Sequence, residues 1–227
     1  MNLPTLEEMM DAGVHFGHKK QRSHPKSKKN IYCLRDGIYV IDLEKTQKLL
    51  ETALGFLTDS IREGKTILLV GTKKQVQGLI QEVGQKTSMP YICNRWLGGT
   101  LTNFETIKKS IKYLEELERK KDSEEFKALT KNERMKIEKE IQKLHQTFDG
   151  ILNMNKMPDV MFVVDAKNED IAILEAVKKE IPLVAICDTD ANPDKIDYPI
   201  PANDDAVKSL KMIIKLVEGA ILEGKGK

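Results

Sequence analysis

The fold of this chain is constrained most by short apolar runs that alternate with segments of helical periodicity. Each run is too short for a helix and lacks polar alternation, as expected of strands buried on both faces of a parallel sheet. The clearest runs are Thr66–Val70, Asp159–Val164 and Leu183–Cys187. Weaker strand signals lie at Pro90–Cys93 and Tyr198–Ile200.

Helical spacing separates these runs and follows the last of them. The helical segments are Leu43–Glu63, Lys74–Lys86, Glu169–Lys179 and Asp204–Leu222. The alternation predicts an α/β fold with a doubly wound, mostly parallel sheet of the flavodoxin-like or Rossmann-like kind. Ligands bind such sheets at the carboxyl ends of the strands, so residues at those ends are the first candidates for a binding or catalytic site.

Residues 104–149 interrupt the alternation. Charged side chains of both signs dominate them, and neither Gly nor Pro occurs before Gly150. Apolar residues recur at spacings of three and four, which is typical of coiled-coil seams. The two seams are Phe104, Ile107, Ile111 and Leu114, then Ile137, Ile141, Leu144 and Phe148. Thr130 and Glu133 have the spacing of a capping box, which starts a second helix.

We therefore expect an antiparallel coiled-coil hairpin at residues 104–149, inserted into an α/β domain. That domain would comprise residues 1–103, with a basic N-terminal arm, and residues 150–227. The composition of the hairpin suits a structural arm and a binding arm equally well.

The segment Asn94–Ile107 connects the two parts. It holds the only tryptophan, Trp96, followed by the pair Gly98 and Gly99. Thr102 and Glu105 have capping-box spacing, and glycines permit tight turns. The segment contains no thiol, imidazole or carboxylate pair that could perform chemistry, so it is typical of a contact surface. Trp96 could stack on a nucleobase or fill the core beneath the loop.

A basic segment, His18–Lys29, contains six Lys or Arg residues and no acid. The whole chain carries a formal net charge of only +2, so a case for nucleic-acid binding depends on this local distribution. Such a run is typical of a flexible arm that contacts a polyanion, or of a solvated loop. Two strands, Asn30–Cys33 and Gly37–Ile41, follow around a hairpin turn at Leu34–Gly37.

Enzyme and metal signatures are weak. Gly71–Lys74 follows a strand and opens a helix, as phosphate loops do, but it lacks P-loop spacing, and no G-x-G-x-x-G occurs. The carboxylates of Asp188–Asp194 indicate a turn more than a metal loop. Zinc ligands could be drawn from His15, His18, His24 and Cys33, although their spacing matches no common pattern. No catalytic residue, cofactor or metal is predicted, and a nucleotide-dependent enzyme remains the alternative.

Cysteine usage and hydropathy bear on the compartment. Cys33, Cys93 and Cys187 are isolated and never form C-x-x-C, which is typical of reduced thiols in the cytosol. Met1–Pro4 does not begin a signal peptide, and no apolar run approaches the roughly 18–20 residues of a membrane span. We expect a cytoplasmic protein without a membrane partner.

Several motifs together resemble the bacterial family of small-subunit ribosomal protein number two. They occur in the order of that family and cover nearly the whole chain. They are Ala12–His18, Gly37–Thr46, Val70–Gln75, Asn94–Ile107, Pro158–Asp159, Asp188–Thr189, Pro193–Asp194, Ile196–Tyr198 and Ile200–Ala206. The chain departs from the family at Ser23–Ser27, where the family has tryptophan and methionine, and at Asp190, where asparagine is common.

The resemblance implies a parallel α/β domain with a protruding coiled coil on the small ribosomal subunit, near the messenger exit side. It implies ribosomal RNA and neighbouring ribosomal proteins as partners, and a link to docking of the large messenger-binding ribosomal protein number one. The ribosome would be cytoplasmic or organellar. A helical scaffold that acts only on proteins is a third hypothesis.

RNA contacts are expected mainly through phosphates, with little base specificity. An arm that becomes ordered on RNA would comprise Lys19, Lys20, Arg22, Lys26, Lys28 and Lys29. Phosphate contacts at the sheet edge would come from Lys73, Lys74 and Arg95. Trp96 would stack on a base if it is not a core residue.

Overall fold

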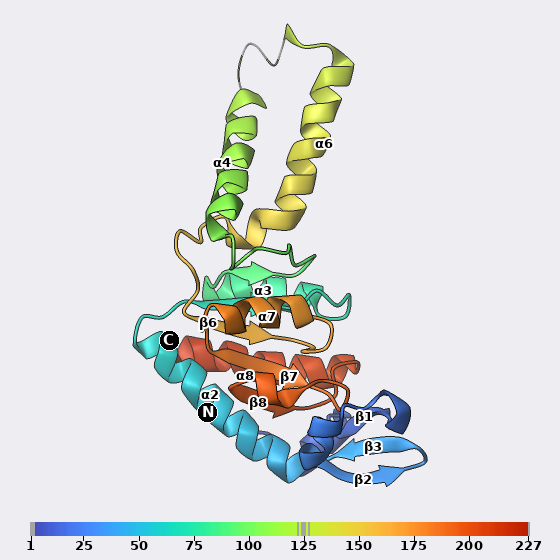
Figure 1. Ribbon diagram of the computed structural model, residues 1–227. Helices are drawn as coiled ribbons and strands as arrows, with labels where there is room; N and C mark the ends of the chain where they lie inside the picture. The colour runs from blue at the N-terminus through green and yellow to red at the C-terminus, as the bar shows by residue number, and fades with distance from the viewer. Residues whose placement is uncertain (1–2, 122, 124–125, 127, 227) are drawn as a thin grey trace.

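The computed structural model describes residues 3–121, 123, 126 and 128–226. Its main sheet has five parallel strands in the order β5-β4-β6-β7-β8 (Figure 1). The strands are β4 (Ile67–Val70), β5 (Tyr91–Ile92), β6 (Val160–Val163), β7 (Leu183–Cys187) and β8 (Tyr198–Pro201). Counted along the chain this is the 2-1-3-4-5 order of flavodoxin-like sheets. The prediction of a doubly wound, mostly parallel α/β sheet is confirmed.

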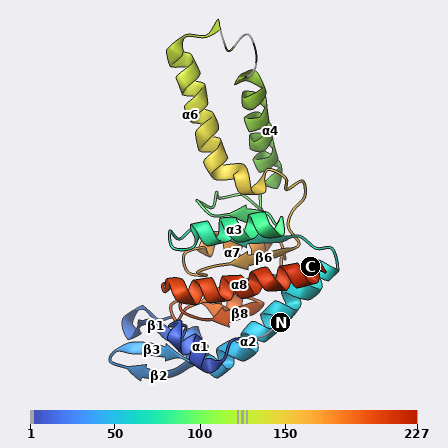
Figure 2. The ribbon, with the colours of Figure 1, turned by 180° about the vertical axis from the view of Figure 1, so that it is seen from behind.

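Two hydrophobic cores lie on opposite faces of the sheet, because alternate residues of each strand point to opposite sides. Ile67, Leu69 and Phe162 face the helices α2, α3 and α8, whereas Leu68 and Met161 face α7 and the segment around Trp96. The helices are α2 (Leu43–Arg62), α3 (Gln77–Thr87), α7 (Asp170–Lys178) and α8 (Val207–Gly224). Figure 2 shows α3 and α8 in front of the sheet.

Two of these helices begin three residues later than the sequence predicts. Lys73–Val76 forms a turn before α3, in which Val76 N donates to Lys73 O. Before α8, the side-chain oxygen of Asn203 accepts hydrogen bonds from the backbone N–H groups of Asp205 and Ala206. This Asx-type turn competes with helical pairing and delays the helix to Val207.

A smaller antiparallel sheet, in the order β1-β3-β2, lies at one end of the molecule (Figure 1). It contains β1 (Phe16–Lys19), β2 (Ile31–Arg35) and β3 (Ile38–Ile41), and follows α1 (Leu6–Asp11). Asp36 and Gly37 both have positive φ, as a type I′ hairpin turn requires. The hairpin was predicted, whereas α1 and β1 were not.

The basic segment is folded, so the prediction of a flexible arm is wrong. It forms β1 and two 3-10 turns, Lys20–Arg22 and Pro25–Asn30. His18 N donates to Thr189 Oγ1 at 2.8 Å, and His24 N donates to Thr189 O at 2.8 Å. The buried Ser27 Oγ also lies 2.5 Å from Thr189 O. A Cβ on Gly17 would lie 2.6 Å from the Thr189 side chain, so only glycine permits this approach.

Helices α4 (Phe104–Lys121) and α6 (Lys131–Phe148) project from the sheet at the opposite end (Figure 1). The apolar residues at their base join the core on the α7 side, among them Ile107, Ile111 and Ile141. The capping box of Thr130 and Glu133 is confirmed. Tyr113 Oη donates to Glu140 Oε1 at 3.1 Å and links the two helices. Residues 122, 124, 125 and 127, between the helices, lie outside the described residues.

Three free cysteines occupy different environments. Cys33 is exposed, Cys93 is half-buried and Cys187 is buried. Within residues 3–226, as far as they are described, no helix combines the length and apolarity needed to cross a membrane.

Candidate nucleic-acid interface

All six cations of the basic segment are exposed: Lys19, Lys20, Arg22, Lys26, Lys28 and Lys29. One carboxylate, Asp194, binds two of them, with its Oδ2 2.9 Å from Lys26 Nζ and its Oδ1 2.7 Å from Lys29 Nζ. These two lysines lower the pKa of Asp194 to about 2. The other four cations form no ion pair among the described residues. The segment therefore presents an excess of positive charge on a folded backbone.

Lys73 has a different environment, because it binds carboxylates. Its Nζ lies 3.0 Å from Asp165 Oδ2, 3.0 Å from Asp204 Oδ1 and 2.6 Å from Asp205 Oδ1. Burial alone would lower the pKa of Lys73, but the three carboxylates outweigh burial and raise it. The lysine lies after β4 and Asp165 after β6, at the point where the strand order reverses. Three carboxylates already neutralise the ammonium of Lys73, which argues against the predicted phosphate contact by this residue.

His18, the first residue of the basic segment, points into the same group of acids. Its Nδ1 lies 3.2 Å from Asp188 Oδ2, and its Nε2 lies 3.5 Å from Asp205 Oδ2 and 3.9 Å from Asp190 Oδ2. The contact with Asp188 raises the pKa of His18 to about 9. Burial, and then the charge of Asp165, raise the pKa of Asp204 to about 8.

We call this group the acidic cluster: Asp165, Asp188, Asp190, Asp204 and Asp205 around Lys73 and His18. Five carboxyl groups face two basic groups. Even with Asp204 protonated, four carboxylates outnumber the two cations, so the cluster repels phosphates and attracts cations. This charge argues against a nucleotide bound by the Gly71 loop.

The cluster offers donors to a divalent ion. Ligand atoms of His18, Asp188 and Asp204 all lie within 4.8 Å of one another, and imidazole with carboxylates suits several divalent metals. The structure does not bring together the four candidate zinc ligands considered from the sequence, His15, His18, His24 and Cys33. Cys33 is exposed on β2, and His24 Nδ1 accepts a hydrogen bond from Lys26 N.

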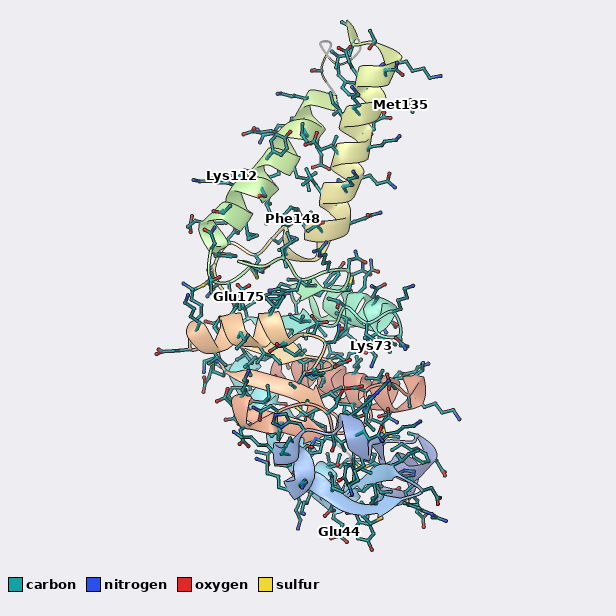
Figure 3. All side chains as sticks on the ribbon, turned by 45° about the vertical axis from the view of Figure 1, so that its right-hand side comes forward. Glu44, Lys73, Lys112, Met135, Phe148 and Glu175 are labelled. Atoms are coloured by element: carbon teal, nitrogen blue, oxygen red, sulfur yellow. The ribbon has the colours of Figure 1, made fainter. Side chains whose placement is uncertain are left out.

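The loop around Trp96 is organised by Glu175 of α7. Trp96 Nε1 donates to Glu175 Oε1 at 3.1 Å, and the backbone N–H of Gly99 donates to the same oxygen at 2.7 Å. Glu175 Oε2 accepts from the backbone N–H groups of Leu101 and Thr102 at 2.9 and 3.0 Å. Glu175 lies where the α4–α6 pair meets the body of the protein (Figure 3). Burial would raise the pKa of Glu175, but these hydrogen bonds outweigh burial and lower it.

The structure supports one of the two roles left open for Trp96 and corrects one other sequence interpretation of this loop. Trp96 is only 9% exposed and belongs to the core, which favours core packing over stacking on a base. The predicted capping box of Thr102 and Glu105 does not form among the described residues, because Thr102 donates from both its backbone and its hydroxyl to Glu175. Gly99 has φ of +96° and makes the turn possible.

Lys74 and Arg95 are exposed, as an RNA contact requires. The structure does not bring Arg95 to the basic segment. Arg95 follows the edge strand β5, whereas the basic segment binds Thr189, after β7. Three strand spacings, about 14 Å, separate β5 from β7.

Comparison with known proteins identifies the family. The model of the family described as Ribosomal protein S2 matches residues 9–224. A small ribosomal subunit protein uS2 from Coprothermobacter proteolyticus is 47% identical over 225 residues, which cover 99% of this chain and 84% of the relative. The uS2 protein of Geotalea uraniireducens is 48% identical over 220 residues, covering 97% and 86% of the two chains.

A third relative, uS2 of Endomicrobium trichonymphae, is 48% identical over 221 residues, covering 97% of this chain and 91% of the relative. Such identity over almost the full length extends well beyond any single motif. The chain belongs to the ribosomal protein S2 family.

Proposed function

We propose that this protein is a structural constituent of the small ribosomal subunit and binds ribosomal RNA through its basic segment. The observation that carries the proposal is the charge of that segment: six exposed cations on a backbone anchored to Thr189, with Asp194 as the paired carboxylate. Family membership agrees with a structural rather than an enzymatic role. The nucleotide-dependent alternative gains no support, since the acidic cluster lies where a nucleotide would bind.

The mechanism is electrostatic. Each lysine or arginine that neutralises a phosphate releases counterions, so affinity falls as salt rises. A segment folded before binding loses less conformational entropy on RNA than a flexible arm would. Lys74 and Arg95 are proposed as further phosphate contacts, on a separate part of the surface.

We also propose that residues 104–149 form an antiparallel coiled-coil hairpin inserted into the domain of residues 1–103 and 150–227. The capping box at Thr130 and the buried seam residues of α4 support this organisation. The hairpin would bind neighbouring small-subunit proteins. The partners implied by the family include the large messenger-binding ribosomal protein number one, and the site of action would be the cytoplasmic ribosome.

The proposal is tested by co-sedimentation with small subunits that have been stripped of this protein. The purified chain is expected to bind at low salt and to dissociate as salt rises. In a variant with Lys19, Lys20, Arg22 and Lys28 changed to Ala, the slope of log affinity against log salt concentration (the salt slope) should be smaller in magnitude by about 3. Each lost phosphate contact removes roughly 0.7–0.9 from that slope.

A matched variant removes four exposed lysines from helices α2, α7 and α8: Lys48, Lys178, Lys208 and Lys211. It loses the same charge and should keep the slope of the unmodified protein. The proposal would fail if the chain stayed free of subunits at low salt while other small-subunit proteins bound. Equal slopes for the two variants would show that the basic segment is not the RNA contact.

A further inference from the structure

We propose that one face of the small sheet β1-β3-β2 is a stacking platform for an unpaired RNA base, centred on Phe16. The inference rests on the proposed RNA-binding function and deepens it. It concerns residues that the phosphate contacts do not use, and it adds a contact to the base itself.

The register of the strands defines this face. Phe16 and Cys33 both pair with Val40, and Lys19 and Arg35 both pair with Ile38. Paired residues in an antiparallel sheet share a face, so two rows cross the sheet side by side. One row is Phe16–Val40–Cys33 and the other is Lys19–Ile38–Arg35. We call these six residues the platform.

The platform is accessible. Phe16 is 51% exposed, and Lys19, Cys33 and Arg35 are also exposed. Val40 and Ile38 are half-buried between them. Leu34 pairs with Tyr39 and lies on the opposite face of the same strand.

Phe16 is also held in place. The ring of His15 lies 4.1 Å from the ring of Phe16, centroid to centroid, at an interplanar angle of 38°. A Cβ on Gly13 would approach Phe16 Cδ2 to 3.5 Å, so the chain passes close to the ring. An aromatic side chain fixed in this way loses little entropy when a flat ligand packs on its free side.

The charge of the platform identifies the ligand class. Its two rows contain cations but no acid, and Lys19 and Arg35 flank the apolar centre. A nucleobase offers a flat apolar surface joined to an anionic backbone, and aromatic side chains on sheets bind unpaired bases in this manner. A protein helix would need a wider apolar surface, since Phe16 is the only large, exposed apolar side chain among these six.

Cys33 provides a direct test, because it is the exposed cysteine and lies in the same row as Phe16. The protein is labelled at Cys33 with a short photoreactive thiol reagent, assembled into stripped small subunits and irradiated. The control carries the label on the opposite face, through Leu34→Cys combined with Cys33→Ser. We expect the Cys33 label to cross-link to an unpaired nucleotide and the control label to give far less of that product.

Variants of Phe16 then test stacking. Phe16→Leu keeps apolar bulk but not the aromatic face, and should weaken binding to subunits by about 5- to 150-fold. Phe16→Trp should bind at least as well as the unmodified protein. Chemical probing of the cross-linked base should show greater reactivity with Phe16→Leu.

Three results would overturn the inference. A protein as the main cross-linked product would make the platform a protein-docking face. Binding by Phe16→Leu equal to that of the unmodified chain would reduce the platform to apolar contact. Assembly without any cross-link from Cys33 would leave the face in solvent. If the chain does not assemble at all, the proposed function fails instead, so the two failures can be told apart.

Discussion

The basic segment and the acidic cluster are adjacent and share His18, yet their charges are arranged in opposite ways. The basic segment has six exposed cations, and one exposed carboxylate outside it, Asp194, pairs with two of them. In the acidic cluster, five carboxylates, mostly buried, surround Lys73 and His18. The ratio of acids to bases and the degree of burial together decide whether a lysine stabilises the fold or remains available to a partner.

Lys73→Ala gives the largest expected effect. The change leaves Asp165, Asp204 and Asp205 facing each other without their common cation. Removing one partner of a buried ion pair costs about 3–5 kcal/mol. We expect a loss of about 2–4 kcal/mol in the free energy of unfolding, because Lys73 is 20% exposed and Asp205 59% exposed. Urea denaturation measures this loss in the free energy of unfolding.

Lys74→Ala is the matched control, since Lys74 is the exposed neighbour of Lys73. It should change stability by less than about 0.5 kcal/mol. If Lys73→Ala left stability unchanged and instead lowered the salt slope of RNA binding, the contrast between the two regions would be lost.

Ser27→Ala tests whether the basic segment owes its order to the loop after β7. Ser27 Oγ is buried and lies 2.5 Å from Thr189 O. Deleting the hydroxyl should cost about 1 kcal/mol and should speed tryptic cleavage at Lys28 and Lys29. Ser23→Ala is the control, because the hydroxyl of Ser23 donates to Lys20 O on the exposed surface. Cleavage at the same rate in both variants would contradict the anchoring role.

The secondary structure of the main sheet was predictable because its strands are buried on both faces and its helices carry regular apolar stripes. Leu183–Cys187 matches β7 to the residue. The short strand β1 was not predictable, because tertiary contacts form it, whereas α1 has a local signal that was missed, the capping box of Thr5 and Glu8. In β1, for example, Gly17 and His18 dock on Thr189, which is 171 residues away from His18 along the chain.

Side-chain partners were the least predictable part of the site. Lys73 and Lys19 look alike in sequence, and only the sheet order brings Asp165, Asp204 and Asp205 to Lys73. Glu175 was missed for the same reason. Its one local signal is an acid among the apolar residues of α7, Ala172, Ile173 and Ala176.

Asp194→Asn tests whether the ion pairs of Asp194 reduce the charge that the basic segment offers to RNA. Asp194 neutralises part of the charge of Lys26 and Lys29, and its loss should free one cation for a phosphate. One further phosphate contact should raise affinity for RNA about five-fold at 0.1 M salt. Filter binding to small-subunit RNA measures the effect. Glu51→Gln, on the exposed face of α2, removes an equal charge that pairs with no cation among the described residues. It should raise affinity less than Asp194→Asn if the pairing of Asp194 with the two lysines matters. Equal gains would mean that net charge alone decides.

A variant of His145 tests whether burial or the ratio of acids to bases explains the difference between the two regions. We expect it to have the smallest effect on stability. One base again faces two carboxylates: His145 Nδ1 lies 2.5 Å from Asp149 Oδ1, and Nε2 lies 2.9 Å from Glu118 Oε1 on α4. Here the groups are one-third to one-half exposed, so water screens them. The contact with Asp149 raises the pKa of His145 above 6.5 in the folded state.

A raised folded pKa means that His145 stabilises the protein fully below about pH 6.5 and that the gain disappears as pH rises through the folded pKa. His145→Gln should therefore cost a few tenths of a kcal/mol near pH 6, and nothing once the imidazole of the unmodified protein has lost its proton. The measurement is the difference in unfolding free energy between the two proteins from pH 5 to pH 9. Because His18 is present in both, its titration cancels in the difference. A pH-independent difference, or one as large as the loss in Lys73→Ala, would contradict the conclusion that burial distinguishes the acidic cluster.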